Sequence, residues 1–188
     1  MSGHSTDPYT VLRAADHRKM RWLNGGGWTS EIIAWPHSEN WEWRLSVADI
    51  EQGGPFSVFA DVDRTIALLQ GSGFVLTVED LPPVTIERPY EPFDFRGDQP
   101  TTCSLLGGPV QDLNLMVRRS STPRHLRFVE IIDTVELVDI ELAIVVSGRL
   151  RVNGHCLSRL DAIRPPADPL TVVFSAASSE RATFAVVT

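Results

Sequence analysis

Short apolar segments of strand length, separated by glycine and proline, constrain the fold of this chain more than any other feature. The 188 residues include 13 glycines and 13 prolines, and few stretches show helical periodicity. Segments 41–50, 74–78 and 142–146 have the alternating or continuous apolar patterns of strands. Short strands at close intervals, with turn signals between them, are typical of β-sandwiches and β-barrels. We therefore predict an all-β fold of antiparallel strands with little helix.

Two glycine turns predict β-hairpins. Residues 66–78 contain two apolar segments around a Gly-Ser-Gly turn, and Asn153-Gly154 is a dipeptide favoured in two-residue hairpin turns. The segment 66–73 also resembles 142–148, because each is an apolar strand followed by a glycine turn. Two related halves in one chain would produce this likeness. So would chance, since hairpins often look alike.

Charge and cysteine usage narrow the range of partners. A net charge of −7 gives a nucleic-acid partner little electrostatic support. No run approaches the roughly 18 apolar residues of a membrane span, and residues 1–8 lack the apolar segment of a signal peptide. Cys103 and Cys156 form no CxxC motif, which favours a reduced, cytoplasmic setting. We expect neither nucleic acid nor membrane as a partner, and the oligomeric state stays open, a homodimer included.

The segment 22–32 holds three consecutive glycines between two tryptophans. Each glycine costs roughly 0.5–1 kcal/mol relative to alanine inside regular structure, so three in a row indicate a special backbone path. Trp22 and Trp28 offer apolar surface beside polar side chains. This mixture is typical of the wall of a small-molecule pocket. A bulged strand start with packed tryptophans explains it equally well.

The segment 41–50 alternates like a strand with two different faces. Leu45 and Val47 lie on one face, and Arg44 and Ser46 lie on the other. Periodicity alone favours an arrangement in which Arg44 and Ser46 lie in solvent and Leu45 and Val47 lie in the core. The alternative directs the polar face into a cavity.

The usual catalytic and metal-binding patterns are missing from the sequence. No pair among the five histidines has the spacing that places two ligands on one strand face. There is no Gly-x-Ser-x-Gly motif, and His155 and Cys156 are neighbours that point to opposite faces of a strand. The glycine run lacks the following Lys-Ser/Thr of a phosphate loop. We expect no metal and no cofactor.

The remaining polar residues suit a ligand with a carboxylate. Arg44, Arg64 and Arg118 can each hold a carboxylate in a bidentate manner. Local ion pairs would account for the arginines as well, because Asp63 adjoins Arg64 and Asp112 lies near Arg118. The neutral hydrogen-bonding candidates are Asn24, Thr29, Ser46, Ser57 and Asn114.

A series of motifs runs in order through residues 10–120. The motifs are Trp22-x-Asn24-Gly25-Gly26-Gly27-x-Thr29-x-Glu31-Ile32, Trp43-Arg44-x-Ser46-x-Ala48-x-Ile50, Gly54-Pro55-Phe56-Ser57-x-Phe59, Asp63-Arg64, Leu68-Leu69 with Gly71-x-Gly73, and Asp112-x-Asn114-x-Met116-x-Arg118. In this combination they resemble the HutD/Ves family, which is associated with bacterial histidine utilisation. The last third of the chain matches only as a generic cupin-like β-domain. Two positions depart from the family pattern: Asp61-Val62 stand where a glycine usually precedes Asp-Arg, and Leu113 stands where phenylalanine is usual.

The resemblance implies a cupin-like double barrel, or bicupin. Residues 9–120 would form an N-terminal barrel carrying the pocket and 121–188 a C-terminal barrel half, the two making one compact unit with strand exchange. The expected ligand-binding residues are Trp22, Asn24, Gly25, Gly26, Gly27, Thr29, Glu31, Arg44, Ser46, Ser57, Phe59, Asp63, Arg64, Asn114 and Arg118.

Three functions are consistent with this reading. The resemblance favours a protein that binds a carboxylate-bearing intermediate of histidine breakdown, such as urocanate or formylglutamate, and modulates histidine utilisation. The second function is a metal-independent cupin enzyme acting on such an acid, with Glu31 as acid/base and Arg44 or Arg64 as an electrophilic clamp. The third is an interaction module whose arginines take no part in small-molecule binding.

Overall fold

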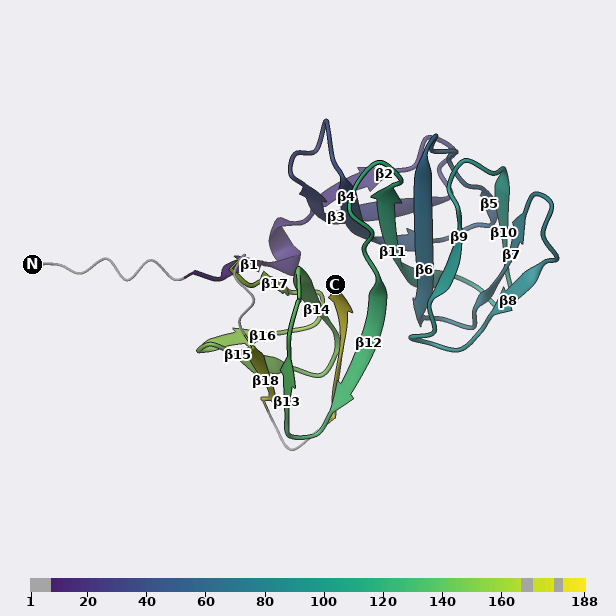
Figure 1. The fold of residues 1–188 in the computed structure, drawn as a ribbon. Coiled ribbons are helices and arrows are strands. Elements are labelled where there is room, and N and C mark those ends of the chain that lie inside the picture. Colours follow the sequence, from purple (N-terminus) through teal and green to yellow (C-terminus); the bar gives the residue numbers. More distant parts are fainter. Residues whose placement is uncertain (1–7, 167–170, 178–180) are drawn as a thin grey trace, which may run out of the picture. The chain divides into compact units, whose positions relative to one another are not determined.

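The computed structural model of the protein describes residues 8–166, 171–177 and 181–188 (Figure 1). Their contacts divide them into two units, one of residues 17–126 and one that combines the residues up to Asp16 with 127–188. The paired strands are antiparallel to their neighbours, and η1 (Ala14–Asp16), a 3-10 turn, is the one helical piece in the described ranges. None of the helical structure in those ranges is long enough to cross a membrane. The prediction of an all-β antiparallel fold is confirmed.

The unit of residues 17–126 consists of two sheets. The first has the strand order β2 (Arg18–Arg21), β3 (Gly27–Trp35), β4 (Trp43–Ile50), β11 (Val110–Arg118), β6 (Val62–Gln70) and β9 (Phe93–Arg96). The second has the order β5 (Gly54–Pro55), β10 (Thr101–Leu105), β7 (Phe74–Val78) and β8 (Val84–Ile86).

The other unit also consists of two sheets. The first has the order β1 (Thr10–Leu12), β17 (Ala162–Arg164), β14 (Leu142–Ser147), β19 (Ala182–Val187) and β12 (Leu126–Ile131), and the second has β13 (Thr134–Leu137), β18 (Val172–Ala176), β15 (Leu150–Val152) and β16 (His155–Leu157). Its edge strand β1 pairs with β17, so residues 10–12 belong to this unit, although the expected N-terminal barrel of residues 9–120 includes them. Arg13 and the backbone N–H of Ala14 donate hydrogen bonds to the Asp161 carboxylate, which also ties residues 13 and 14 to this unit.

The inward face of the six-stranded sheet changes from apolar to polar along its strands. Ile50, Leu68 and Val110 pack with Phe74 and Leu76 of the four-stranded sheet in a closed core. At the other end of the same three strands the inward positions are taken by polar side chains: Arg44 and Ser46 of β4, Arg64 of β6, and Asp112 and Asn114 of β11. The two sheets are therefore packed together at one end and separated by polar groups at the other.

The expected hairpin between residues 66–69 and 74–78 is wrong, although both strands exist. β6 pairs with β9 and β11, whereas β7 pairs with β8 and β10. The turn between them carries the chain from one sheet to the other. Gly71 and Gly73 adopt φ of +102° and +98°, and a Cβ on Gly73 would lie 2.4 Å from the carbonyl oxygen of Ile86. The turn therefore connects strands of two different sheets and does not join two hydrogen-bonded neighbours, as a hairpin turn would.

The hairpin predicted at Asn153-Gly154 is confirmed. β15 pairs with β16 through Val152 and His155, and both turn residues have positive φ, as a type I′ turn requires. The likeness between residues 66–73 and 142–148 also has a structural counterpart. β14 passes to β15 of the other sheet of its unit at Gly148, just as β6 passes to β7.

The triple-glycine segment forms the tight connection between β2 and β3. Trp22 donates its backbone N–H to Gly27 over 3.0 Å, and Gly25, at φ +73°, donates to Trp22 over 3.0 Å. Gly27 lies against β4, where a Cβ would approach the carbonyl oxygen of Asp49 to 2.4 Å. Gly25 needs its left-handed conformation and Gly27 needs the space, so the two glycines serve different purposes.

Gly27→Ala and Gly25→Ala form a matched pair that tests this difference. A Cβ at Gly27 meets backbone, whereas one at Gly25 meets nothing within 4 Å. We expect Gly27→Ala to lower the free energy of unfolding by about 3 kcal/mol or more, and Gly25→Ala by about 1 kcal/mol through backbone strain alone. Denaturant unfolding of both variants measures this, and equal losses would contradict the close approach of β3 to β4.

Candidate functional site

A cavity of about 510 Å³ lies within the unit of residues 17–126, at the polar end of the six-stranded sheet. Its walls come from three places: the end of β2 with the following loop, the inward face of β3, β4, β6 and β11, and the segment 55–59, which begins at the last residue of β5. The volume falls within the range of about 300–1,000 Å³ that is usual for small-molecule sites.

Most of the residues expected from the sequence meet around this cavity. Those in its wall are Trp22, Asn24, Thr29, Arg44, Ser46, Ser57, Phe59, Arg64 and Asn114. Leu45 and Val47 are fully buried on the opposite face of β4. The polar face of β4 therefore faces a cavity, and the interpretation that placed Arg44 and Ser46 in solvent is wrong.

The other expected residues lie outside the cavity wall. The glycines at 25–27 shape the loop that carries Trp22 and Asn24. Glu31 places its carboxylate 3.8 Å from Arg44 and accepts a long hydrogen bond from Ser38. Arg118 donates Nε to the carbonyl oxygen of Trp41 over 2.7 Å and stacks on that ring, so it pairs with no local acid in the described structure.

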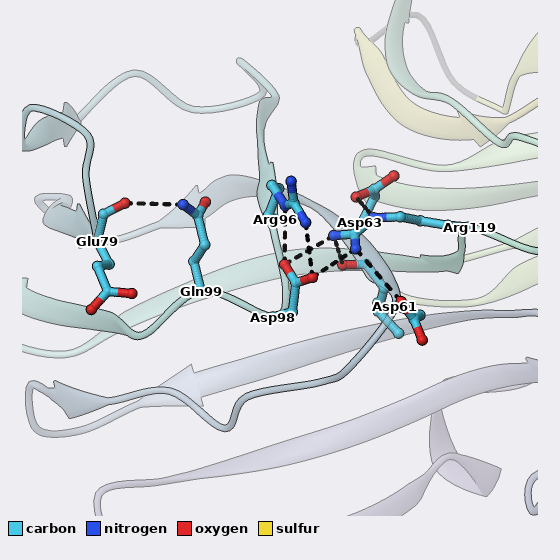
Figure 2. Close-up of polar contacts among 8 residues, drawn as sticks. Asp61, Asp63, Glu79, Arg96, Asp98, Gln99 and Arg119 are labelled. Carbon is cyan, nitrogen blue, oxygen red and sulfur yellow. Dashed lines mark hydrogen bonds and ion pairs between the residues drawn. The ribbon is translucent and has the colours of Figure 1, made fainter.

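Asp63 also lies outside the cavity, in an ionic network shown in Figure 2. Arg119 binds Asp63 through Nε at 2.8 Å and Asp98 through both terminal nitrogens, at 2.7 and 3.0 Å. Arg96 binds the same Asp98 carboxylate, and the two arginines hold its pKa well below the usual range. Asp63 therefore pairs with Arg119 and not with its neighbour Arg64. The network fastens the end of β9 to the start of β6.

The structure adds several residues to the site that the sequence-based list omits. They are Met20, Arg21, Leu23, Ala48, Pro55, Phe56, Asp112 and Met116. The signal for Asp112 was the alternation Asp112-x-Asn114-x-Met116, which places all three side chains on one face of β11. The alternative in which Asp112 pairs with Arg118 is wrong, because Asp112 lines the cavity and Arg118 binds Trp41.

Arg64 is a buried cation surrounded by aromatic rings. The residue is 6% exposed, and its Cζ lies 4.8 Å from the ring centre of Phe95 and 5.1 Å from that of Phe56. It makes no hydrogen bond or ion pair within the described part of the chain. Burial lowers the pKa of Arg64 to about 10, against the nearby charge of Asp112, which raises it. The guanidinium is thus held by rings and Coulomb attraction, with its hydrogen-bonding capacity unused.

Asp112 is the acid beside this cation. It is 1% exposed, and its Oδ1 is buried without a hydrogen-bond partner. Burial raises the pKa of Asp112 from 3.8 to about 7; Arg64 lowers it and Asp49 raises it further. The carboxyl group therefore changes its charge near neutral pH.

Four buried polar atoms in the cavity wall lack a partner: Nε of Arg44, Nε of Arg64, Oδ1 of Asp112 and Oδ1 of Asn114. The register places them in three successive rows on one face of the sheet: Met116 lies between Arg44 and Arg64, Asn114 lies opposite Ser46, and Asp112 lies opposite Ala48. Buried polar groups in native proteins are normally hydrogen-bonded, so a cluster of unused ones facing a cavity indicates a ligand site.

The loop 22–27 between β2 and β3 is held in place by local hydrogen bonds. Trp22 donates Nε1 to Oγ1 of Thr29 over 2.8 Å, and its ring meets Phe56 edge to face at 6.2 Å. Asn24 accepts a hydrogen bond from the backbone N–H of Gly26 over 3.0 Å. The loop thus presents an indole surface to the cavity. No cluster of three or more His, Cys, Asp or Glu side chains suited to a metal occurs in the described ranges.

The HutD family model matches residues 14–179. The chain belongs to the HutD family. An uncharacterised 21.2 kDa protein in the hutC 3′ region of Pseudomonas putida is 45% identical over 56% of this chain, and the match spans 56% of that protein's length. Protein Ves of Cronobacter sakazakii is 33% identical over 73% of this chain and 76% of its own.

Solved structures agree with this assignment. The structure of HutD from Pseudomonas fluorescens SBW25, in a formate condition, covers 96% of this chain and 98% of its own with a TM-score of 0.79 and 33% identity. A cupin 2 conserved barrel domain protein from Leptotrichia buccalis covers 85% of this chain and 86% of its own with a TM-score of 0.58 and 10% identity, a likeness of fold alone. The HutD chain thus has the expected cupin-like fold.

Asp112→Asn tests the electrostatics of the site. Because the folded HutD chain keeps a proton on Asp112 up to about pH 7 and the unfolded chain loses it near 3.8, the stability that this proton contributes is complete below pH 3.8 and is lost as the pH rises through 7. Asparagine stays neutral throughout. We expect the free energy of unfolding of Asp112→Asn, relative to wild type, to rise by on the order of 4 kcal/mol between pH 4 and pH 8.

Denaturant unfolding at a series of pH values measures this difference. A difference that stays constant from pH 4 to pH 8 would mean that Asp112 titrates as an exposed carboxyl does.

Proposed function

We propose that this HutD protein binds a small carboxylate-bearing intermediate of histidine breakdown, such as urocanate or formylglutamate, and thereby modulates histidine utilisation. The observation that carries the proposal is the pair Arg44 and Arg64, whose buried Nε atoms lack partners in the wall of one cavity. A guanidinium offers donors in a planar fork that matches a carboxylate. An acid in the cavity would use donors that the protein leaves unused.

The overall charge opposes such a ligand, but the local charge supports it. The chain carries a net charge of −7, and this field is screened beyond roughly 8 Å at physiological salt. The cavity wall carries Arg21, Arg44 and Arg64 against one buried acid, Asp112, which is half protonated near pH 7, and Glu31 adds one negative charge 3.8 Å from Arg44. A bound anion therefore meets a positive local field.

The names of the relatives support the biological setting. One relative is described by its place in the hutC 3′ region, and another is HutD itself, solved in a formate condition. Formate is the smallest carboxylate. For the chain described here, the acid, the regulatory role and the cytoplasmic location remain parts of the proposal.

Calorimetric titration with urocanate and with N-formylglutamate tests binding. We expect Arg64→Gln and Arg44→Gln each to weaken the affinity for the acid that binds by roughly 10–100-fold, because each removes a charge-assisted hydrogen bond. Arg88→Gln is the matched control, since Arg88 is an exposed arginine of the same unit outside the cavity. No binding of either acid at millimolar concentration would overturn the proposal, and equal losses in all three variants would remove the cavity arginines from it.

An enzyme acting on such an acid is the second candidate, and Asp112 favours it more than Glu31 does. Glu31 lies outside the cavity wall beside Arg44. Asp112 lies in the wall with a pKa raised by burial to about 7, where a general acid or base is most effective.

Proton NMR of the acids incubated with the protein tests catalysis. For an enzyme we expect new signals to appear at a rate proportional to protein concentration, and Asp112→Asn to abolish them while calorimetry still detects binding. Unchanged spectra over days, with binding retained, would leave the binding protein as the function.

A further inference from the structure

Two of the unused atoms in the cavity wall are hydrogen-bond acceptors. Asn114 is 9% exposed, its side chain makes no hydrogen bond within the described structure, and its Oδ1 is buried. Asp112 likewise has a buried Oδ1 without a partner. An amide oxygen only accepts, and so does the Asp112 carboxylate once it is ionised, above about pH 7. A ligand that carried nothing but a carboxylate would satisfy the arginines and leave the oxygen of Asn114 unpaired.

The surroundings of the acceptors make this requirement strict. Across the strands, Asn114 is flanked by Ser46 of β4 and Ile66 of β6, and Asp112 is flanked by Ala48 of β4 and Leu68 of β6. Of these buried neighbours only Ser46 carries a donor, and it makes no hydrogen bond to Asn114 in the described structure. A ligand that displaces solvent from this end must bring the missing donor itself, because a buried acceptor without one weakens binding.

The register also places the arginines and Asn114 on separate rows of the sheet. Arg44, Met116 and Arg64 form one row across β4, β11 and β6, and the row of Asn114 lies two residues before Met116 on β11. Rows two residues apart on one face of a sheet are separated by about 7 Å. The arginines hold the acid end, and the row of Asn114 holds the other end.

We propose that the ligand of this cavity carries an N–H donor about 5–7 Å from its carboxylate, and that Asn114, supported by Asp112, selects for this donor. The inference rests on the proposed function and narrows it to acids that contain an amide or azole N–H. Simple aliphatic or aromatic acids of the same size are discriminated against.

Two pairs of probes that differ only at the donor test this selection. The first pair is trans-urocanate and trans-3-(2-furyl)acrylate, in which a furan replaces the imidazole and removes its N–H. The second pair is N-formylglutamate and the formyl ester of 2-hydroxyglutarate, in which an ester oxygen replaces the amide N–H. Calorimetric titration of wild type with all four acids gives the ratio of affinities within each pair.

We expect wild type to bind the N–H member of at least one pair roughly 10–100-fold more tightly than its analogue. Asn114→Ala should reduce that ratio to less than about threefold, mainly by weakening the N–H member. Asn114→Asp keeps an acceptor oxygen at the same place and should keep the preference, whatever the change in overall affinity. A thermal melt of each variant confirms that it is folded.

The outcomes separate this inference from the function on which it rests. Equal affinity of wild type for both members of each pair would overturn the donor selection and leave acid binding intact. A preference that survives unchanged in Asn114→Ala would assign the donor site to another residue. No binding of any of the four acids would overturn the proposed function and the inference together.

Discussion

A buried cation beside a buried acid is the interaction on which the rest of this site depends. Arg64 and Asp112 extend from neighbouring strands of one sheet, and each is almost completely removed from solvent. Desolvation of a charge costs several kcal/mol after relaxation, and the attraction between two charges offsets it only with good geometry and additional hydrogen bonds. Those hydrogen bonds are missing here. The pair is therefore a poor device for stability and a suitable one for binding.

The surrounding core, aromatic rings and ionic network keep Arg64 and Asp112 in place. Buried apolar side chains at one end of β4, β6 and β11 pack the two sheets together. The rings of Phe56 and Phe95 hold the Arg64 guanidinium from the sides, and a Cβ on Gly97 would lie 3.1 Å from its side-chain carbons. The network of Arg96, Asp98 and Arg119 fastens the strand end that carries Phe95 (Figure 2). A preorganised guanidinium loses little freedom when an anion arrives.

Local patterns predict the strands and the Asn153-Gly154 hairpin, and the ligand-binding residues expected from the family resemblance supply nine of the seventeen residues in the cavity wall. Local patterns failed where pairing between distant segments decides the outcome. Strand, glycine turn and strand describe a hairpin and a corner between sheets equally well, so residues 66–78 were misassigned. For the same reason a partner that is near in sequence is wrong for both Asp63 and Asp112: Asp63 pairs with Arg119, and the register sets Asp112 opposite Ala48 and Leu68, where the charge of Arg64 still acts on it. Burial of the polar face of β4 could not be read from periodicity, because alternation is the same in solvent and in a cavity.

The most direct test of this account is the pKa of Asp112 itself, followed by carbon-13 NMR of its side-chain carboxyl with and without a bound acid. The account predicts a pKa of about 7 in the free protein, far above the ordinary value of 3.8. It also predicts an upward shift when an acid binds, because the anion competes with Asp112 for Arg64. A pKa near 3.8 that no acid displaces would contradict both the buried pair and the ligand site built around it.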